Sequence, residues 1–98
     1  MQRQILQVIH SGGFYGAERM LADHCLALSD LIDTTVVLIG PSKELLQKFA
    51  DLGVRCCECN TVDDLVQLAR NKGALLNAHN FKAQVYAWLA APRARIPL

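Results

Sequence analysis

Short apolar runs alternate along the chain with longer stretches in which apolar and polar residues mix. Each run stops at a glycine, a proline or a polar cluster, which is typical of a buried strand. The runs predict strands at residues 5–9, 34–39, 54–59 and 74–78. They are nearly continuously apolar, as strands are when helices cover both faces of their sheet.

The stretches between these runs repeat apolar residues every three or four positions, which is the spacing of a helix with one buried face. The first predicted helix starts at Gly16, and the residues at this spacing are Ala17, Met20, Leu21, His24, Leu28 and Leu31. Further helices are predicted at about residues 42–52, 61–72 and 81–91. Pro92 is expected to end the last one, because proline has no N–H to donate.

Residues suited to capping support these boundaries. Ser42 is expected to cap the second helix, and Gly53 lies where a C-terminal cap belongs. Thr61 and Asp64 resemble a capping box in which Asp replaces the usual Glu. Gly73 is expected to end the third helix.

Strand and helix alternate without a break, which predicts an α/β fold. Right-handed crossovers then give a Rossmann-like open parallel sheet with helices on both faces, in the strand order three-two-one-four. Residues 95–98 look like the approach to a fifth strand, so we expect a single but incomplete domain over residues 1–98.

Composition narrows the class of protein. Hydrophobic residues make up 52% of the chain and charged residues 19%, which is sufficient for a packed core. The net charge is +1 with no basic stripe, which argues against a nucleic-acid partner. No apolar run is long enough to span a bilayer and no signal peptide is recognisable, so a cytoplasmic location is expected.

The cysteines raise the question of a metal. Cys56 and Cys59 have the spacing of a zinc ligand pair, but no second pair follows and His79 has no partner histidine at ligand spacing. In a strand, Cys57 and Cys59 would share a face that Cys56 does not. We expect reduced, buried thiols and no metal, with a metal site and a disulfide as the open alternatives.

The loop after the first strand is the candidate site. His10 is followed by Ser11, Gly12, Gly13, Phe14, Tyr15 and Gly16, where a helix begins. Adjacent glycines allow close approach of a ligand and unusual backbone dihedrals, and a helix N-terminus favours an anion such as a diphosphate. The spacing is neither the dinucleotide fingerprint nor a P-loop. A tight strand-to-helix turn without a ligand is the alternative.

The residues Val8-Ile-His-Ser-Gly-Gly-Phe-Tyr-Gly-Ala-Glu-Arg-Met-Leu21 resemble the opening of the glycosyltransferase-4-like N-terminal domain. The resemblance continues through Thr35-Val-Val-Leu-Ile-Gly40, Leu52-Gly-Val54 and Asn77-Ala-His-Asn80, and so covers nearly the whole chain. It implies the acceptor-side half of a two-domain GT-B enzyme that transfers a hexose from a nucleotide sugar with retention.

The resemblance also implies roles for residues. Gly12 and Gly13 would contact the donor diphosphate through their amides, Ser11, Phe14, Tyr15 and Gly16 would line the cleft, and His79 and Asn80 would lie at its rim. Phe14 and Tyr15 could instead be loop anchors, and His79 could bond a loop backbone. His10 is expected to be structural, and Glu18 to act at the helix start.

The chain departs from the family pattern at its end. The histidine after the fifth strand and the second domain, with its paired glutamates, are absent. The expected partners, a nucleotide sugar and an acceptor, would therefore bind only with the missing part. No cofactor is expected. The fragment alone is expected to be inactive and to self-associate, and the full enzyme is compatible with peripheral membrane binding. The alternative is a stand-alone flavodoxin-like binding or regulatory domain, although its phosphate loop would have only Ser11.

Overall fold

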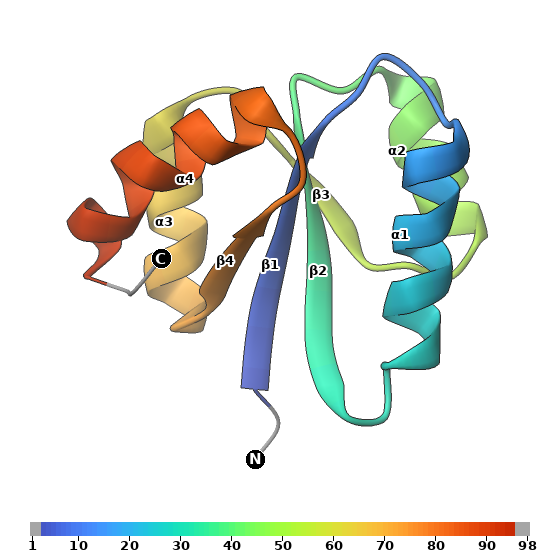
Figure 1. Cartoon of the computed structure of the whole chain (residues 1–98), viewed down its shortest axis with the longest axis horizontal. Helices are drawn as coiled ribbons and strands as arrows, with labels where there is room; N and C mark the ends of the chain where they lie inside the picture. The colour runs from blue at the N-terminus through green and yellow to red at the C-terminus, as the bar shows by residue number, and fades with distance from the viewer. Residues whose placement is uncertain (1–2, 96–98) are drawn as a thin grey trace.

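A parallel sheet of four strands, flanked by two helices on each face, forms the protein in a computed structural model that describes residues 3–95 (Figure 1). The strands lie in the order β3-β2-β1-β4, as the crossover rule predicted. The elements, in chain order, are β1 (Arg3–His10), α1 (Gly16–Ala27), β2 (Ile32–Ile39), α2 (Lys43–Asp51), β3 (Cys56–Cys59), α3 (Val62–Lys72), β4 (Leu75–Ala78) and α4 (Phe81–Ala94).

The sheet separates two apolar layers. On one face, side chains of α1 and α2 pack on β1 and β2, with Phe49 and Leu38 fully buried between them. On the other face, α3 and α4 pack on the same strands, with Leu65 and Leu6 at the centre. Burying a side chain of this size stabilises the fold by roughly 1.5–3 kcal/mol. The predicted doubly covered sheet is therefore confirmed.

Local capping fixes the helix boundaries. The Leu45 amide donates to Ser42 Oγ over 3.1 Å, and the Asp64 amide donates to Thr61 Oγ1 over 3.1 Å. The Thr61 amide donates back to Asp64 Oδ2 over 3.2 Å, which completes the predicted capping box. Gly53 and Gly73 have φ of +79° and +58° and end their helices in the left-handed region.

Two helices differ from prediction. α1 ends at Ala27, and of the predicted inward residues Leu21 is buried, whereas Met20 and Leu31 are 70% and 72% exposed. The buried residues of α1 are Glu18, Leu21, Ala22 and Cys25. α4 continues through Pro92 to Ala94. Pro92 lies in the last turn, where the loss of one hydrogen bond is offset because the continued helix buries Ala94 and brings Arg93 within 2.9 Å of Asp63.

The third strand confirms the predicted separation of the cysteines. Cys59 and Cys57 pack into the layer beneath α3 and α4, whereas Cys56 packs into the layer beneath α1 and α2. The strand begins at Cys56 rather than at residue 54, although the Val36 amide already donates to the Arg55 carbonyl over 2.9 Å. The four thiols are free.

The predicted approach to a fifth strand falls mainly on residues 96–98, which lie outside the described part of the chain. Arg95, the last described residue, ends α4 with a φ of 60°. Within residues 3–95 no helix has the length and apolar character needed to cross a membrane.

Candidate functional site

The carboxyl ends of β1 and β4 lie side by side at the point where the chain reverses direction across the sheet (Figure 1). β2 and β3 lie on one side of β1, and the chain then crosses to place β4 on the other. In open parallel sheets, ligands bind in the crevice that opens at such a switch point. The predicted site residues all follow these two strand ends.

The loop from Ser11 to Gly16 is closed by its own serine. The Gly13 amide donates to Ser11 Oγ over 3.2 Å, and Ser11 Oγ donates to the Gly13 carbonyl over 2.6 Å. A hydroxyl that bridges two backbone groups in this way forms a tight turn. The loop therefore has a defined shape before any ligand binds.

The two adjacent glycines do not use the left-handed dihedrals that glycine allows. Gly40, Gly53 and Gly73 are the glycines with positive φ, whereas Gly12 and Gly13 are not among them. The Ser11 hydroxyl supplies the turn without a left-handed residue. What distinguishes Gly13 is space, because an added Cβ would lie 3.0 Å from the Tyr15 ring. A Cβ added at Gly12 would meet no atom within 4 Å, so the space beside this residue is open.

The two aromatic residues of the loop have different environments. Phe14 packs its ring edge-to-face on Phe49 of α2, with ring centroids 5.4 Å apart and planes at 74°. Lys48 Nζ lies 5.6 Å from the Phe14 ring centroid. Phe14 is therefore a loop anchor, as the alternative interpretation held. Tyr15 is 71% exposed and remains available to line a cleft.

The N-terminus of α1 differs from those of the other helices. Ser42, Thr61 and Asn80 each accept a hydrogen bond as N-cap side chains, whereas no side chain caps α1. Instead, Glu18 accepts from the Tyr15 amide over 2.8 Å and is only 6% exposed, which confirms its role at the helix start. The first amides of α1 are the groups that an anion would approach.

Asn80 ties β4 to the end of β1. Its Nδ2 donates to the His10 carbonyl over 2.5 Å, and its Oδ1 accepts from the Ala83 amide over 3.2 Å as the N-cap of α4. The His10 amide also lies 3.4 Å from Asn80 Oδ1. Asn80 is therefore largely committed to structure, and His10 contributes its backbone, as expected of a structural residue.

His79 lies beside Asn80 but is held by a different partner. Its amide donates to the Val8 carbonyl over 3.0 Å, and its Nε2 lies 2.7 Å from Gln7 Oε1. The same oxygen accepts from Asn77 Nδ2 over 2.8 Å. The prediction placed His79 at the rim, but it missed Gln7 and Asn77, which the sequence alone gave no reason to pair with it.

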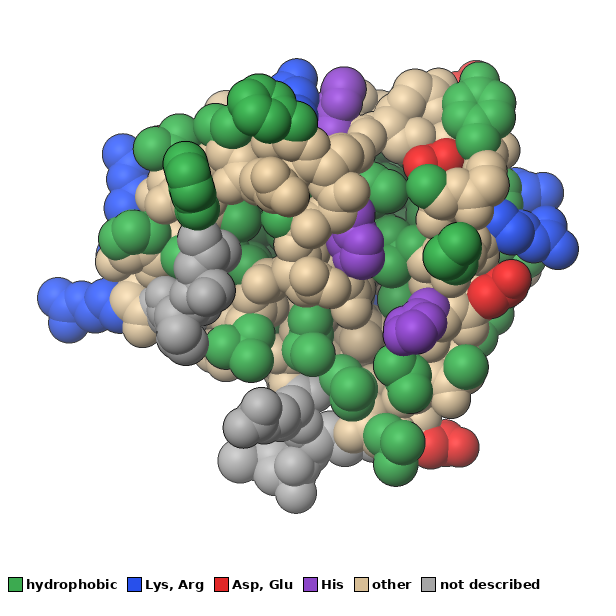
Figure 2. Space-filling view, viewed as in Figure 1, with side chains coloured by type: hydrophobic (Ala, Val, Ile, Leu, Met, Phe, Trp, Pro, Cys, Tyr) green, Lys and Arg blue, Asp and Glu red, His purple; other side chains and the backbone are tan. Residues whose placement is uncertain are grey.

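The environment of His79 favours a neutral ring. Partial burial of the imidazole lowers its pKa below the usual value of 6.5, and the nearby charge of His24 lowers it further. Figure 2 shows histidine side chains around a hollow on the face that opens between α4 and α1. Among the described residues, no hydrogen bond joins His79 or Asn80 to the loop from Ser11 to Gly16, so the two halves of the site are separately anchored.

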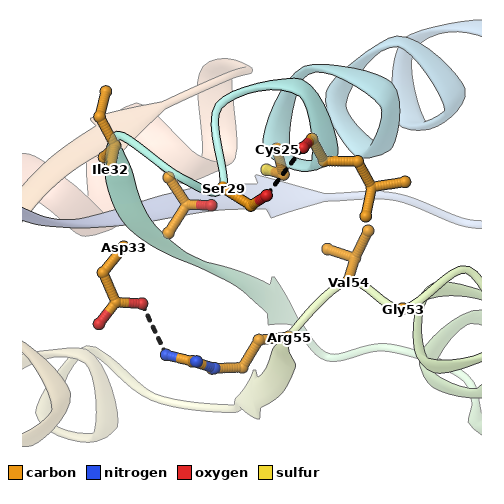
Figure 3. Close-up of a pocket in the computed structure, with 9 residues that line it drawn as sticks. Cys25, Ser29, Ile32, Asp33, Gly53, Val54 and Arg55 are labelled. Carbon is orange, nitrogen blue, oxygen red and sulfur yellow. Dashed lines mark hydrogen bonds and ion pairs between the residues drawn. The ribbon is translucent and has the colours of Figure 1, made fainter.

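A pocket lies at the opposite, amino end of the sheet (Figure 3). Cys25, Ser29 and Val54 line it, and an ion pair of 2.6 Å between Arg55 and Asp33 spans its edge. Burial raises the pKa of the Cys25 thiol, which makes it a poor nucleophile. This pocket is remote from the switch point, and its two charged side chains, Asp33 and Arg55, are paired with each other.

The other cysteines also have suppressed reactivity. Burial, followed by the nearby charge of Asp64, raises the pKa of Cys59 to about 11. Within residues 3–95 no group of three or more His, Cys, Asp or Glu residues has an arrangement that could hold a metal ion.

Comparison with known proteins gives a structural match only. No protein-family model and no curated protein sequence matches the chain. A crystal structure of Anabaena Alr3699/HepE in complex with UDP and glucose superposes on 99% of this chain with a TM-score of 0.82 and 24% identity. A structure of the same protein in complex with UDP superposes on 97% with a TM-score of 0.80 and 25% identity.

This chain spans 29% and 28% of the length of those two chains. At this level of identity the likeness shows the fold. The chain has the α/β fold of part of a GT-B Rossmann-like domain, in agreement with the predicted fold class.

Proposed function

We propose that this chain is the acceptor-side, N-terminal part of a retaining GT-B glycosyltransferase that moves a hexose from a nucleotide sugar to an acceptor. The observation that carries the proposal is the match of 99% of the chain, at a TM-score of 0.82, to a protein in complex with UDP and glucose. The resemblance of the loop around Gly12 and Gly13 to the glycosyltransferase-4-like family supports the same assignment. In this proposal a further domain completes the donor site, and this chain alone is inactive.

The loop is the proposed diphosphate site. The open space at Gly12 and the first amides of α1, which lie beyond the Tyr15 amide held by Glu18, together offer backbone donors to an anion. The Gly13 amide already donates to Ser11 Oγ, and at 3.2 Å this long bond is one that a phosphate oxygen could replace. Tyr15 and Gly16 would then line the cleft, with His79 and Asn80 at its rim.

The remaining parts of the proposal follow the resemblance. The partners are a nucleotide sugar and an acceptor, with no nucleic acid and no cofactor. A cytoplasmic location, with peripheral binding to a membrane in the full enzyme, is part of the same proposal.

Self-association of the isolated chain is proposed from its exposed edge. Among the described residues β4 pairs with β1 alone, so its outer edge is unpaired. Beside it, α4 buries only alanines and exposes larger apolar side chains, with Phe81 at 80%, Trp88 at 72% and Leu89 at 54%. Sedimentation at high micromolar concentration should show a dimer or larger species. A strict monomer would refute this part of the proposal.

Binding of UDP tests the main proposal. Titrating UDP into the isotopically labelled chain should shift the amide resonances of residues 12–17 at millimolar concentration, whereas uridine without phosphates should not. Gly12→Ala is the sharpest variant, because its Cβ meets nothing in the fold but occupies the space proposed for the ligand. It should leave the spectrum of the free protein intact and weaken the shifts. Shifts centred on Arg55 and Cys25, or equal binding by Gly12→Ala, would overturn the proposal.

A further inference from the structure

Gln7 is a buried polar residue in an otherwise apolar part of β1. Its side chain is 8% exposed, and its neighbours Leu6 and Val8 are almost wholly buried. Parallel pairing places Gln7 opposite Asn77 of β4. A buried amide without partners would destabilise the fold, so its hydrogen bonds identify what it does.

The carbonyl oxygen of Gln7 receives two donors. Asn77 Nδ2 lies 2.8 Å from Gln7 Oε1, and His79 Nε2 lies 2.7 Å from the same atom. Asn77 presents its amide nitrogen, which can only donate, to the carbonyl oxygen of Gln7. That oxygen can only accept, and His79 Nε2 must therefore carry the hydrogen.

The position of the His79 backbone is fixed as well. Its amide donates to the Val8 carbonyl over 3.0 Å, one residue beyond Gln7 on the same strand. Asn80, the next residue, holds the His10 backbone with its side chain. His79 is thus held on β1 by its own amide, by one ring nitrogen and by the side chain of the adjacent Asn80.

We propose that Gln7 is a positioning residue that holds His79 as the neutral Nε2–H tautomer and leaves Nδ1 as a hydrogen-bond acceptor for a hydroxyl group of a sugar ligand. The assignment of a sugar as the ligand rests on the proposed function, whereas the tautomer does not. In a neutral imidazole one nitrogen donates and the other accepts, so a donor bond from Nε2 leaves the lone pair on Nδ1.

The surroundings of His79 agree with a neutral ring. Partial burial lowers its pKa, and the electrostatic interaction with His24 of α1 lowers it further. No described carboxylate is hydrogen-bonded or ion-paired to this ring, so nothing offsets these two effects. An imidazolium would have hydrogens on both nitrogens and could not accept a bond from a hydroxyl.

The tautomer is measured directly by long-range ¹H–¹⁵N correlation spectra of the labelled, ligand-free chain near neutral pH. We expect His79 as the Nε2–H form, in about five- to tenfold excess over the other tautomer, from one neutral hydrogen bond. An Nδ1–H form, which would require Gln7 to donate rather than accept, or an even mixture of the two, would overturn the proposal.

Variants separate positioning from stability. Gln7→Met keeps the length of the side chain and removes the acceptor. The excess of the Nε2–H tautomer of His79 over the Nδ1–H tautomer should therefore fall severalfold, towards the ratio in free imidazole. Gln7→Glu keeps an acceptor and should restore the Nε2–H form while raising the pKa of His79. Thr35→Val is the matched control, since Thr35 is a buried polar residue of β2 at 5% exposure, and it should leave His79 unchanged.

If the tautomer ratio of His79 is unchanged in Gln7→Met, then Gln7 does not position His79. If that variant does not fold, the spectrum of the unmodified chain still decides the proposal, because the tautomer is predicted there. UDP titration plays no part in this measurement. A chain that shows the Nε2–H form but binds no UDP would retain the positioning role of Gln7 and lose the proposed function.

Discussion

The edge-to-face pair of Phe14 and Phe49 should couple the Gly loop to the core, and a double-mutant cycle can measure the coupling. Phe49 is fully buried, and its ring lies 5.4 Å from that of Phe14 at 74°. Replacing each by leucine keeps most of the apolar area but removes the aromatic geometry. The aromatic pair should contribute about 0.5–1.5 kcal/mol beyond the burial of area.

Each single variant should lower the free energy of unfolding, and Phe49→Leu should have the larger effect because it also leaves unfilled core volume. The double variant should lose less stability than the two single variants lose together, and the difference is the coupling energy. Urea unfolding followed by far-ultraviolet circular dichroism is the suitable assay, since Trp88 is 72% exposed and a poor reporter of the core. A coupling of 1 kcal/mol corresponds to roughly 4–8 °C in Tm for a domain of this size.

Lys48 complicates the cycle because its Nζ lies 5.6 Å from the Phe14 centroid. Lys48→Met serves as the control, and it should lower the free energy of unfolding by no more than about 0.5–1 kcal/mol. The cycle should therefore be repeated in that background, where the coupling between the two phenylalanines should persist. A coupling below about 0.3 kcal/mol in both backgrounds would mean that the loop is not anchored through this pair.

Three further outcomes are expected. Gly13→Ala should destabilise the protein by less than about 1 kcal/mol, because the φ of Gly13 is ordinary and the added Cβ meets only the exposed Tyr15 ring. Thermal unfolding should show that this loss of stability vanishes in a Tyr15→Ala background. Asn80→Ala should lower the free energy of unfolding, measured in urea, by about 1–2 kcal/mol, because it removes the N-cap bond and the bond to His10. Asn80→Asp should keep the cap but lose the donor to the His10 carbonyl. Cys59 should alkylate far more slowly than a free thiol at pH 9 and approach full reactivity only near its pKa of about 11, which peptide mapping after iodoacetamide treatment would follow. Because this pKa is raised above the unfolded value of 9.0, its contribution to stability is complete below pH 9 and is lost as the pH rises towards 11.

The fold could be predicted because its signals are local. Ser42, Thr61, Gly53 and Gly73 mark helix ends with side-chain or backbone chemistry that acts within a few residues, and each does so in the structure. The crossover rule then restricts the strand order to the one observed. Pro92 did not end the helix, because the added turn buries Ala94 and pairs Arg93 with Asp63.

The candidate site was only partly predictable, because its decisive contacts join distant residues. Gln7 and His79 are 72 positions apart, and their hydrogen bond depends on the register that places Gln7 opposite Asn77. In the sequence, Gln7 is a polar residue within an apolar run, and nothing in the run shows that its side chain has a specific partner. The ordinary dihedrals of Gly12 and Gly13 could not be predicted for a related reason, since the sequence does not show that the Ser11 hydroxyl closes the turn.

These contacts make β1 the element on which both halves of the site depend. The loop continues directly from its last residue, and His79 is held by Gln7 and Val8, which lie three and two residues before that end. The loop is additionally fixed to α2 through Phe14, so a movement of α2 would displace the loop while leaving His79 in place. If the two halves bind one ligand, the packing of α2 against β1 and β2 is what sets the distance between the diphosphate and the sugar hydroxyl.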